Sequence, residues 1–219
     1  QSYFFTAPRI LVREITNEFL YCCYTDEEYY NTPSIINIVD KEGIVKLKFA
    51  LSILNSKLIG WYHNTTSPKA QKGLFPKILV NDVRNIPIRK ISEEKQQPLI
   101  EKADKMLFKN KELHELKTNF LNFLKSELKP AKISRKLQNW HKLDWEAFKK
   151  ELKKCKAKDL NLQERKEWLS YFTEQKGKAA EIQTIIDSTD REIDQMVYEL
   201  YGLTEEEIHV VENNYKEKK

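Results

Sequence analysis

Residues Ile193 to Ile208 read IDQMVYELYGLTEEEI, which spells a helix, a stop and the start of a second helix. The apolar residues of the first half recur at three- and four-residue steps and therefore share one helix face: Ile193, Met196, Val197 and Leu200. Gly202 supplies the left-handed residue that ends a helix, and Thr204 with Glu207 forms the capping box that begins the next. The sequence therefore predicts a helical hairpin at this end of the chain.

A second long helix is predicted to begin at Ser92, because Ser is a favoured N-cap and two acids follow in the first turn. Its apolar residues follow four- and three-residue steps: Leu99, Ala103, Met106, Leu113, Phe120 and Leu124. Two such stripes predict an antiparallel pair. In that pair we expect the Ile193, Met196 and Leu200 face to lie against Met106, Leu113 and Phe120. The intervening aromatic residues predict a small helical cap: Trp140, Trp145, Trp168, Tyr171 and Phe172.

The chain before Ile91 has a different pattern. Short β-branched and aromatic runs predict a hairpin of residues 10–15 and 19–24 and a third strand at 34–39. The period then changes, which predicts one buried helix over 44–62, a polar loop over 63–74 and extended pieces at 75–80 and 86–88. We therefore predict an α+β fold, with a mixed α/β subdomain at 1–91 and a helical subdomain at 92–219. The helical part comprises a long helix (92–128), an inserted cap (130–176), a return helix (177–201) and a terminal helix (204–214).

Composition narrows the class of protein. The chain has 219 residues and a net charge of +5, but the surplus of positive charge is concentrated over 61–91 and 129–158. Such basic stretches suit a binder of phosphate backbones, although a solvated lysine-rich helix is the alternative for the second stretch. The absence of long apolar runs and the three cysteines favour a cytoplasmic protein. The first residue, Gln1, suggests a fragment of a longer chain.

Catalytic motifs are absent from the sequence. With 5 Gly, no G-x-G or G-x-x-x-x-G-K motif for dinucleotides or phosphates can be written. The Asn-Pro-Pro-Tyr type of motif that positions an adenine amino group is missing as well, and the 4 His are scattered without zinc-ligand spacing. We therefore predict no catalytic, cofactor-binding or metal-binding residues in this chain.

Several segments, taken in order, resemble a known family: Ile10–Arg13, Asp26–Tyr30, Ser34–Ile38, Ala50–Leu58, Phe75–Ile78, Asn85–Ile88 and Ile193–Ile208. The set is similar to the TaqI-type C-terminal specificity domain of type II adenine-specific DNA methyltransferases and of fused type IIG restriction–modification enzymes. It is more distantly similar to specificity subunits of type I systems. The resemblance implies a non-catalytic DNA target-recognition domain whose methyltransferase domain lies N-terminal in the same chain. S-adenosylmethionine, and Mg²⁺ in an enzyme that also cleaves, are expected in the catalytic domains of such a parent protein.

Recognition of duplex DNA needs side chains that reach base edges and cations that contact the backbone. The loop predicted at 63–74 contains both kinds, and two strand arginines and a following lysine add to them. The predicted DNA-binding residues are Arg9, Arg13, Asn64, Thr65, Thr66, Ser67, Lys69, Gln71, Lys72 and Lys77. Two alternatives remain at this point: a type I-like specificity module whose helices mainly hold partner subunits, and a helical interaction scaffold with no nucleic-acid role.

Overall fold

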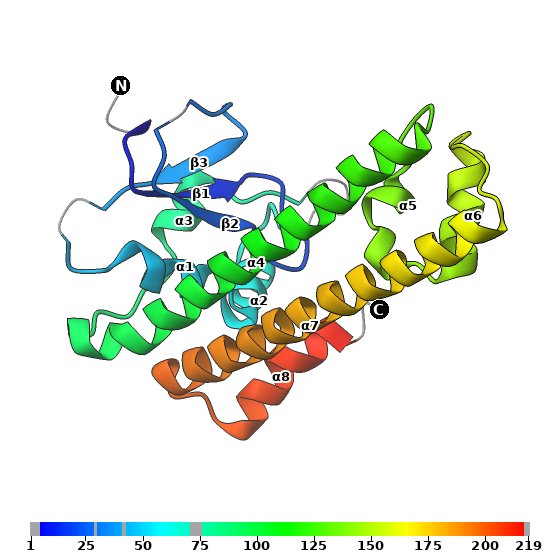
Figure 1. Ribbon diagram of the computed structural model, residues 1–219. Coiled ribbons are helices and arrows are strands. Elements are labelled where there is room, and N and C mark those ends of the chain that lie inside the picture. Colours follow the sequence, from blue (N-terminus) through cyan, green and yellow to red (C-terminus); the bar gives the residue numbers. More distant parts are fainter. Residues whose placement is uncertain (1–4, 29, 41–42, 71–75, 217–219) are drawn as a thin grey trace. The chain divides into compact units, whose positions relative to one another are not determined.

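The computed structural model describes residues 5–28, 30–40, 43–70 and 76–216 (Figure 1). The chain forms two compact units, which are considered separately below. The sheet unit comprises residues 1–105 and 189–219, and the helical unit comprises residues 106–188. A three-stranded antiparallel sheet in the first unit and long helices shared by both confirm the α+β class. The contacts therefore divide the chain at other positions than Ile91, where the sequence pattern changes.

The sheet has the order β2-β1-β3, with β1 (Arg9–Arg13) between β2 (Cys22–Thr25) and β3 (Ile35–Ile38). Both neighbours pair antiparallel with β1, which confirms the predicted hairpin and third strand. Ile10 and Val12 are fully buried on one face of β1. Helix α1 (Leu47–Asn55) contacts β1 and β2, and its last residue fastens the edge strand, since the Asn55 amide bonds both the N–H (3.0 Å) and the C=O (3.1 Å) of Cys22.

The predicted helix over 44–62 is wrong in one respect, because the structure contains two helices there. Ser56 is extended (φ −69°, ψ 155°) and separates α1 from α2 (Lys57–Thr66). The Ser56 hydroxyl donates to the Ile53 carbonyl at 2.7 Å and accepts from the Ile59 N–H at 3.4 Å, so one side chain ends a helix and caps the next. A further short helix, α3 (Val80–Arg84), begins where an extended piece was predicted to end.

The three longest helices among the described residues follow: α4 (Glu93–Leu128), α7 (Leu162–Tyr201) and α8 (Glu205–Lys216). The turn between α7 and α8 confirms the local prediction, because Gly202 has φ +72° and Thr204 exchanges hydrogen bonds with Glu207. Helices α4 and α7 pack together, as expected. However, α7 begins at Leu162, well before the predicted start at 177.

The helical unit has its own core. It is made by the later part of α4, the short helices α5 (Arg135–Gln138), η2 (Trp140–Lys142) and α6 (Trp145–Lys154), and the first part of α7. Phe120 lies at its centre, stacked on Trp140 with 3.8 Å between ring centroids. The predicted pairing of Phe120 with the Ile193 face is therefore wrong. Phe120 packs on Trp168 and Tyr171 of α7, whereas Glu192 of α7 pairs with Lys102, nearer the start of α4.

Candidate nucleic-acid interface

A cavity of about 800 Å³ opens in the sheet unit beside the turn that joins β1 to β2. Its described lining comes from three segments, namely that turn, the end of α2 and the chain after α2: Asn17, Glu18, Phe19, Tyr21, Asn64, Ala70 and Pro76. The lining combines aromatic rings with amide groups. Rings and amides of this kind suit the apolar surfaces and the hydrogen-bonding edges of nucleotide bases.

The β1–β2 turn forms one wall of the cavity because it is docked closely on α2. Asn64 of α2 donates its amide to the Glu18 carbonyl at 2.9 Å. One turn earlier, a Cβ on Gly60 would lie 2.8 Å from the same carbonyl and 2.6 Å from the Tyr215 hydroxyl. Tyr215 of α8 also stacks on Phe19, with 4.7 Å between ring centroids. The absence of a side chain at Gly60 is therefore what lets the turn approach the helix.

We expect Gly60→Ala to destabilise the protein although alanine favours helices. The added methyl meets a backbone carbonyl, and overpacking of this kind typically lowers stability by about 1–3 kcal/mol. The better helix propensity of alanine offsets about 1 kcal/mol of this cost. Gly177→Ala is the matched control, because Gly177 lies in α7 and a Cβ added there would meet nothing within 4 Å. The control should instead stabilise the protein by about 0.5–1 kcal/mol. Urea unfolding of both variants measures the difference, and equal stabilisation would show that the turn does not touch α2.

Three cations adjoin the lining of this cavity, one by contact and two as neighbours in the sequence. Arg13, at the end of β1, is exposed, and its guanidinium carbon lies 5.6 Å from the ring centroid of Tyr21, a lining residue. Lys69 is exposed and precedes the lining residue Ala70. Lys77 follows Pro76 and forms an ion pair with Glu14 at 3.3 Å, in which its side chain stays 42% exposed. An ion pair this exposed is weak and can yield to a phosphate group.

Arg9 differs from Arg13, although both lie on the same face of β1. Its side chain is fully buried, and its guanidinium donates to the Phe5 carbonyl and lies 5.9 Å from the Phe5 ring. Burial removes Arg9 from the surface that a duplex could reach. The structure therefore does not bring Arg9 to the interface, and its role is to hold the segment before β1 against the sheet.

The segment predicted as a loop over 63–74 is partly helical, because α2 continues to Thr66. The hydroxyls of Thr65 and Thr66 both donate to carbonyls of the preceding turn. Ser67 is buried, 3.4 Å from Asp82, and its N–H donates to the His63 carbonyl. The hydroxyls of Thr65 and Thr66 are therefore engaged at the end of α2, and that of Ser67 is engaged with Asp82. Gln71 and Lys72 lie outside the residues that the structure describes.

Tyr21 and Asn17 line the cavity but were not among the predicted DNA-binding residues. Both come from the hairpin, whose aromatic residues indicate strands rather than a binding surface. Tyr21 is 43% exposed, so its ring is available to a ligand. The alternation of the strand offered a signal, because Tyr21 stands opposite Arg13, whose N–H donates to the Tyr21 carbonyl. Arg84, at the end of α3, is a further exposed cation without an ion pair among the described residues.

His63 precedes the lining residue Asn64 in the sequence. It is buried, and burial lowers its pKa, although nearby Asp82 and a hydrogen bond with the Lys77 main chain oppose that shift. The described residues do not bring three or more His, Cys, Asp or Glu side chains into one metal-binding group. Across the same residues, no helix combines the length and apolar character that crossing a bilayer requires.

Comparison with protein families identifies two consecutive regions. Residues 1–88 match the TaqI-like C-terminal specificity domain, and residues 92–197 match a domain of unknown function, DUF8810. The first region is therefore a TaqI-like specificity domain, as the six segments between Ile10 and Ile88 predicted. The seventh segment of the resemblance, Ile193–Ile208, lies outside the residues that match this family. The two matches meet where the sequence pattern changes, near Ile91. No curated protein and no solved structure matches the chain.

Proposed function

We propose that this chain, in which residues 1–88 are a TaqI-like C-terminal specificity domain, reads a short double-stranded DNA sequence for an adenine-N6-specific restriction–modification enzyme. The observation that carries the proposal is the family match together with the cavity beside the β1–β2 turn. A specificity domain implies a role in DNA target recognition and is not catalytic by itself. Methyl transfer with S-adenosylmethionine, and any cleavage, would belong to other domains of the parent protein.

The cavity supports this proposal because it offers groups that can contact bases and cations that can contact phosphates. Arg13, steadied by the Tyr21 ring, can present its guanidinium to the O6 and N7 atoms of guanine. Asn17 and Asn64 are amides of the kind that pair with adenine, and the oxygen of the Asn64 side chain is not used in its bond to Glu18. Lys69 and Lys77 would contact phosphates and fix the register of the domain on the duplex.

We expect Arg13→Gln to reduce sequence discrimination more than overall affinity. A bidentate arginine contact with a base is worth about 1–3 kcal/mol, so binding to a selected sequence should weaken about tenfold or more. Binding to unrelated duplexes should change much less. The measurement is fluorescence anisotropy with duplexes selected from a random pool by the unaltered chain, against scrambled duplexes.

Lys69→Gln should act differently. It should weaken binding to every duplex and make the slope of log K against log salt shallower by about 1 unit. Lys95→Gln is the control, because Lys95 is exposed on the first turn of α4 and has no ion pair among the described residues. The proposal fails if selection enriches no sequence, or if the Arg13→Gln and Lys69→Gln variants bind like the control while circular dichroism shows an intact fold. In that case the helical scaffold becomes the better interpretation.

A further inference from the structure

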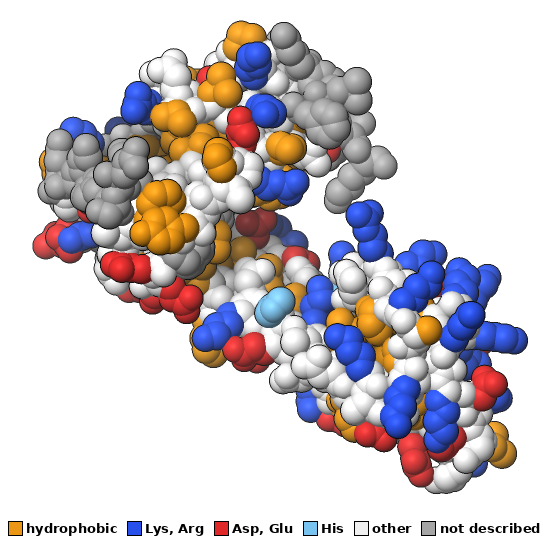
Figure 2. All heavy atoms as spheres, turned by 90° about the horizontal axis from the view of Figure 1, so that it is seen from above, with side chains coloured by type: hydrophobic (Ala, Val, Ile, Leu, Met, Phe, Trp, Pro, Cys, Tyr) orange, Lys and Arg blue, Asp and Glu red, His pale blue; other side chains and the backbone are white. Residues whose placement is uncertain are grey.

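The net positive charge of the chain resides in the helical unit and not in the sheet unit. The helical unit has 19 Lys and Arg against 12 Asp and Glu, a net charge of +7. The sheet unit has 19 against 21, a net charge of −2. Figure 2 shows Lys and Arg side chains gathered over the part of the helical unit formed by α5 and α6. The surplus of positive charge therefore lies outside the specificity domain of residues 1–88.

Many of these cations are not neutralised within the protein. Among the described residues, the following exposed lysines have no ion pair: Lys129, Lys132, Lys136, Lys142, Lys150, Lys153 and Lys156. The pKa of His141 falls to about 4, mainly through burial and further through the charges of Lys117 and Lys142. Uncompensated charge of one sign opposes the compact state, and a bound polyanion would relieve it.

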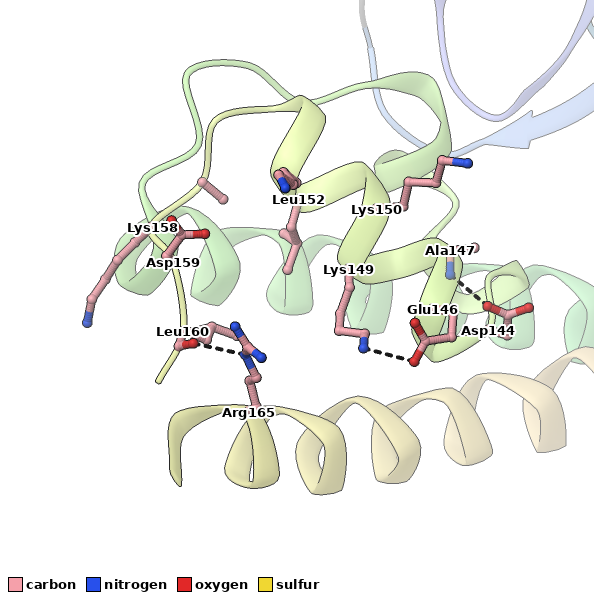
Figure 3. Close-up of a pocket in the computed structure, with 12 residues that line it drawn as sticks. Asp144, Glu146, Ala147, Lys149, Lys150, Leu152, Lys158, Asp159, Leu160 and Arg165 are labelled. Carbon is pink, nitrogen blue, oxygen red and sulfur yellow. Dashed lines mark hydrogen bonds and ion pairs between the residues drawn. The ribbon is translucent and has the colours of Figure 1, made fainter. Parts of the chain in front are cut away.

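A cleft of about 720 Å³ lies within this region, between α6 and the first turns of α7 (Figure 3). Its lining contains five cations: Lys149, Lys150, Lys153, Lys158 and Arg165. Three acids also line it, but Asp144 caps α6 through the Ala147 N–H (2.7 Å) and Glu146 pairs with Lys149 (2.8 Å). Asp159 is the remaining acid of the lining.

Arg165 is the best-placed cation in the cleft. It rises from α7 toward α6, and its Nε donates to the Leu160 carbonyl at 2.9 Å (Figure 3). That bond fixes the plane of the guanidinium. Both Nη groups remain available, because the described residues provide no hydrogen-bond partner for them. A planar guanidinium with two free N–H groups matches the oxygens of a phosphate. Lys153 adds a point charge from the α6 wall.

We propose that the α6–α7 cleft is a second, sequence-independent contact for the phosphodiester backbone of DNA. The choice of duplex DNA as the polyanion rests on the proposed function of residues 1–88. The same part of the helical unit carries the exposed lysines without ion pairs named above, which are more cations than a single phosphate ion requires but suit a run of phosphates. The helical unit then supplies affinity, and the specificity domain supplies discrimination.

The test compares two double variants of the full chain, each lacking two positive charges. Lys153→Gln/Arg165→Gln removes one free cation from each wall of the cleft. Lys111→Gln/Lys125→Gln removes two exposed lysines of α4 in the same unit, which lie outside the cleft and have no ion pair among the described residues. Binding to a mixed-sequence duplex is measured by anisotropy between about 50 and 200 mM salt.

For the cleft variant we expect affinity to fall about tenfold or more at low salt, and the slope of log K against log salt to become shallower by about 2 units. The α4 variant should change the slope by clearly less. Equal effects of the two variants would overturn the proposal, because they would indicate only the diffuse field of the unit. Displacement of the duplex by inorganic phosphate, beyond that by chloride at equal ionic strength, would also overturn it in favour of a small-anion site.

The outcome separates this inference from the proposed function. If Lys69→Gln and Arg13→Gln weaken binding while the cleft variant does not, the cleft proposal is wrong and the recognition proposal stands. If only the cleft variant weakens binding, the cleft binds DNA and the hairpin cavity does not. If the unaltered chain binds no duplex, both are wrong.

Discussion

Replacing Phe120 with alanine is expected to remove most of the stability of the helical unit. Phe120 is 1% exposed, and its ring stacks on Trp140 and on Tyr171 at a centroid distance of 5.5 Å. The edges of three further rings, those of Phe148, Trp168 and Phe172, surround it. Loss of a buried phenylalanine costs about 3–5 kcal/mol, and a domain has only about 5–15 kcal/mol in total.

Tryptophan fluorescence during urea unfolding measures this effect, because three of the 4 Trp (Trp140, Trp145 and Trp168) lie in the helical unit. Phe108→Ala is the control: Phe108 lies on the same helix, α4, but is 64% exposed, so its loss should cost less than about 1 kcal/mol. If the two variants unfold at similar urea concentrations, the aromatic cluster does not organise the core of this unit.

Phe120 also shows why the pairing of the long helices was predicted wrongly. A stripe of apolar residues repeats every seven residues, so sliding one helix along the other by a heptad leaves the pattern unchanged. The register is set by contacts between distant residues, such as Phe120 with Tyr171 and Lys102 with Glu192. The periodicity of the sequence predicts that the two helices pair, but it does not determine the register in which they pair.

Local signals were more reliable, because they depend on neighbouring residues alone. Gly202 and the Thr204–Glu207 box ended and began helices as predicted. The break between α1 and α2 at Ser56 was not predicted, because the apolar spacing continues through this residue while its hydroxyl acts as a cap. Alternation placed Arg9 and Arg13 on one strand face, yet Arg9 is buried because Phe5 lies against it. Burial of a strand residue depends on what covers it, which alternation does not encode.

Asp194 is the clearest case of a residue that the sequence pattern could not explain. It lies among the apolar residues of α7, and its carboxylate accepts the Lys57 N–H at 2.9 Å, at the start of α2. The Lys57 ammonium lies 3.2 Å from Asp194 and 2.9 Å from Glu212 of α8. Tyr198 and Tyr215 complete the network, donating to Glu212 and to the Lys57 carbonyl. Lys57 and its partners on α7 and α8 lie more than a hundred residues apart in the sequence.

Lys57→Met should therefore be the second strongly destabilising change. It removes the cation that pairs with both Asp194 and Glu212, and Asp194 is only 5% exposed. Breaking a buried pair from one side costs about 3–5 kcal/mol. DNA binding should weaken too, because Tyr215, which contacts both Lys57 and the β1–β2 turn, helps to position one wall of the cavity. Adding Asp194→Asn to this variant removes one of the stranded charges, so the double variant should recover part of the loss.

The same network predicts a pH dependence with a defined sign. Burial raises the pKa of Asp194 from its ordinary 3.8 to about 6, although the Lys57 N–H and ammonium oppose the shift. The folded protein therefore holds a proton that the unfolded chain releases between these two values. This contribution to stability is complete below about pH 4 and is lost as the pH rises through 6. Asp194→Asn has no such proton, so its free energy of unfolding should rise relative to that of the unaltered chain across this window. Parallel curves from pH 4 to pH 7 would mean that Asp194 is ionised throughout, with Lys57 outweighing burial.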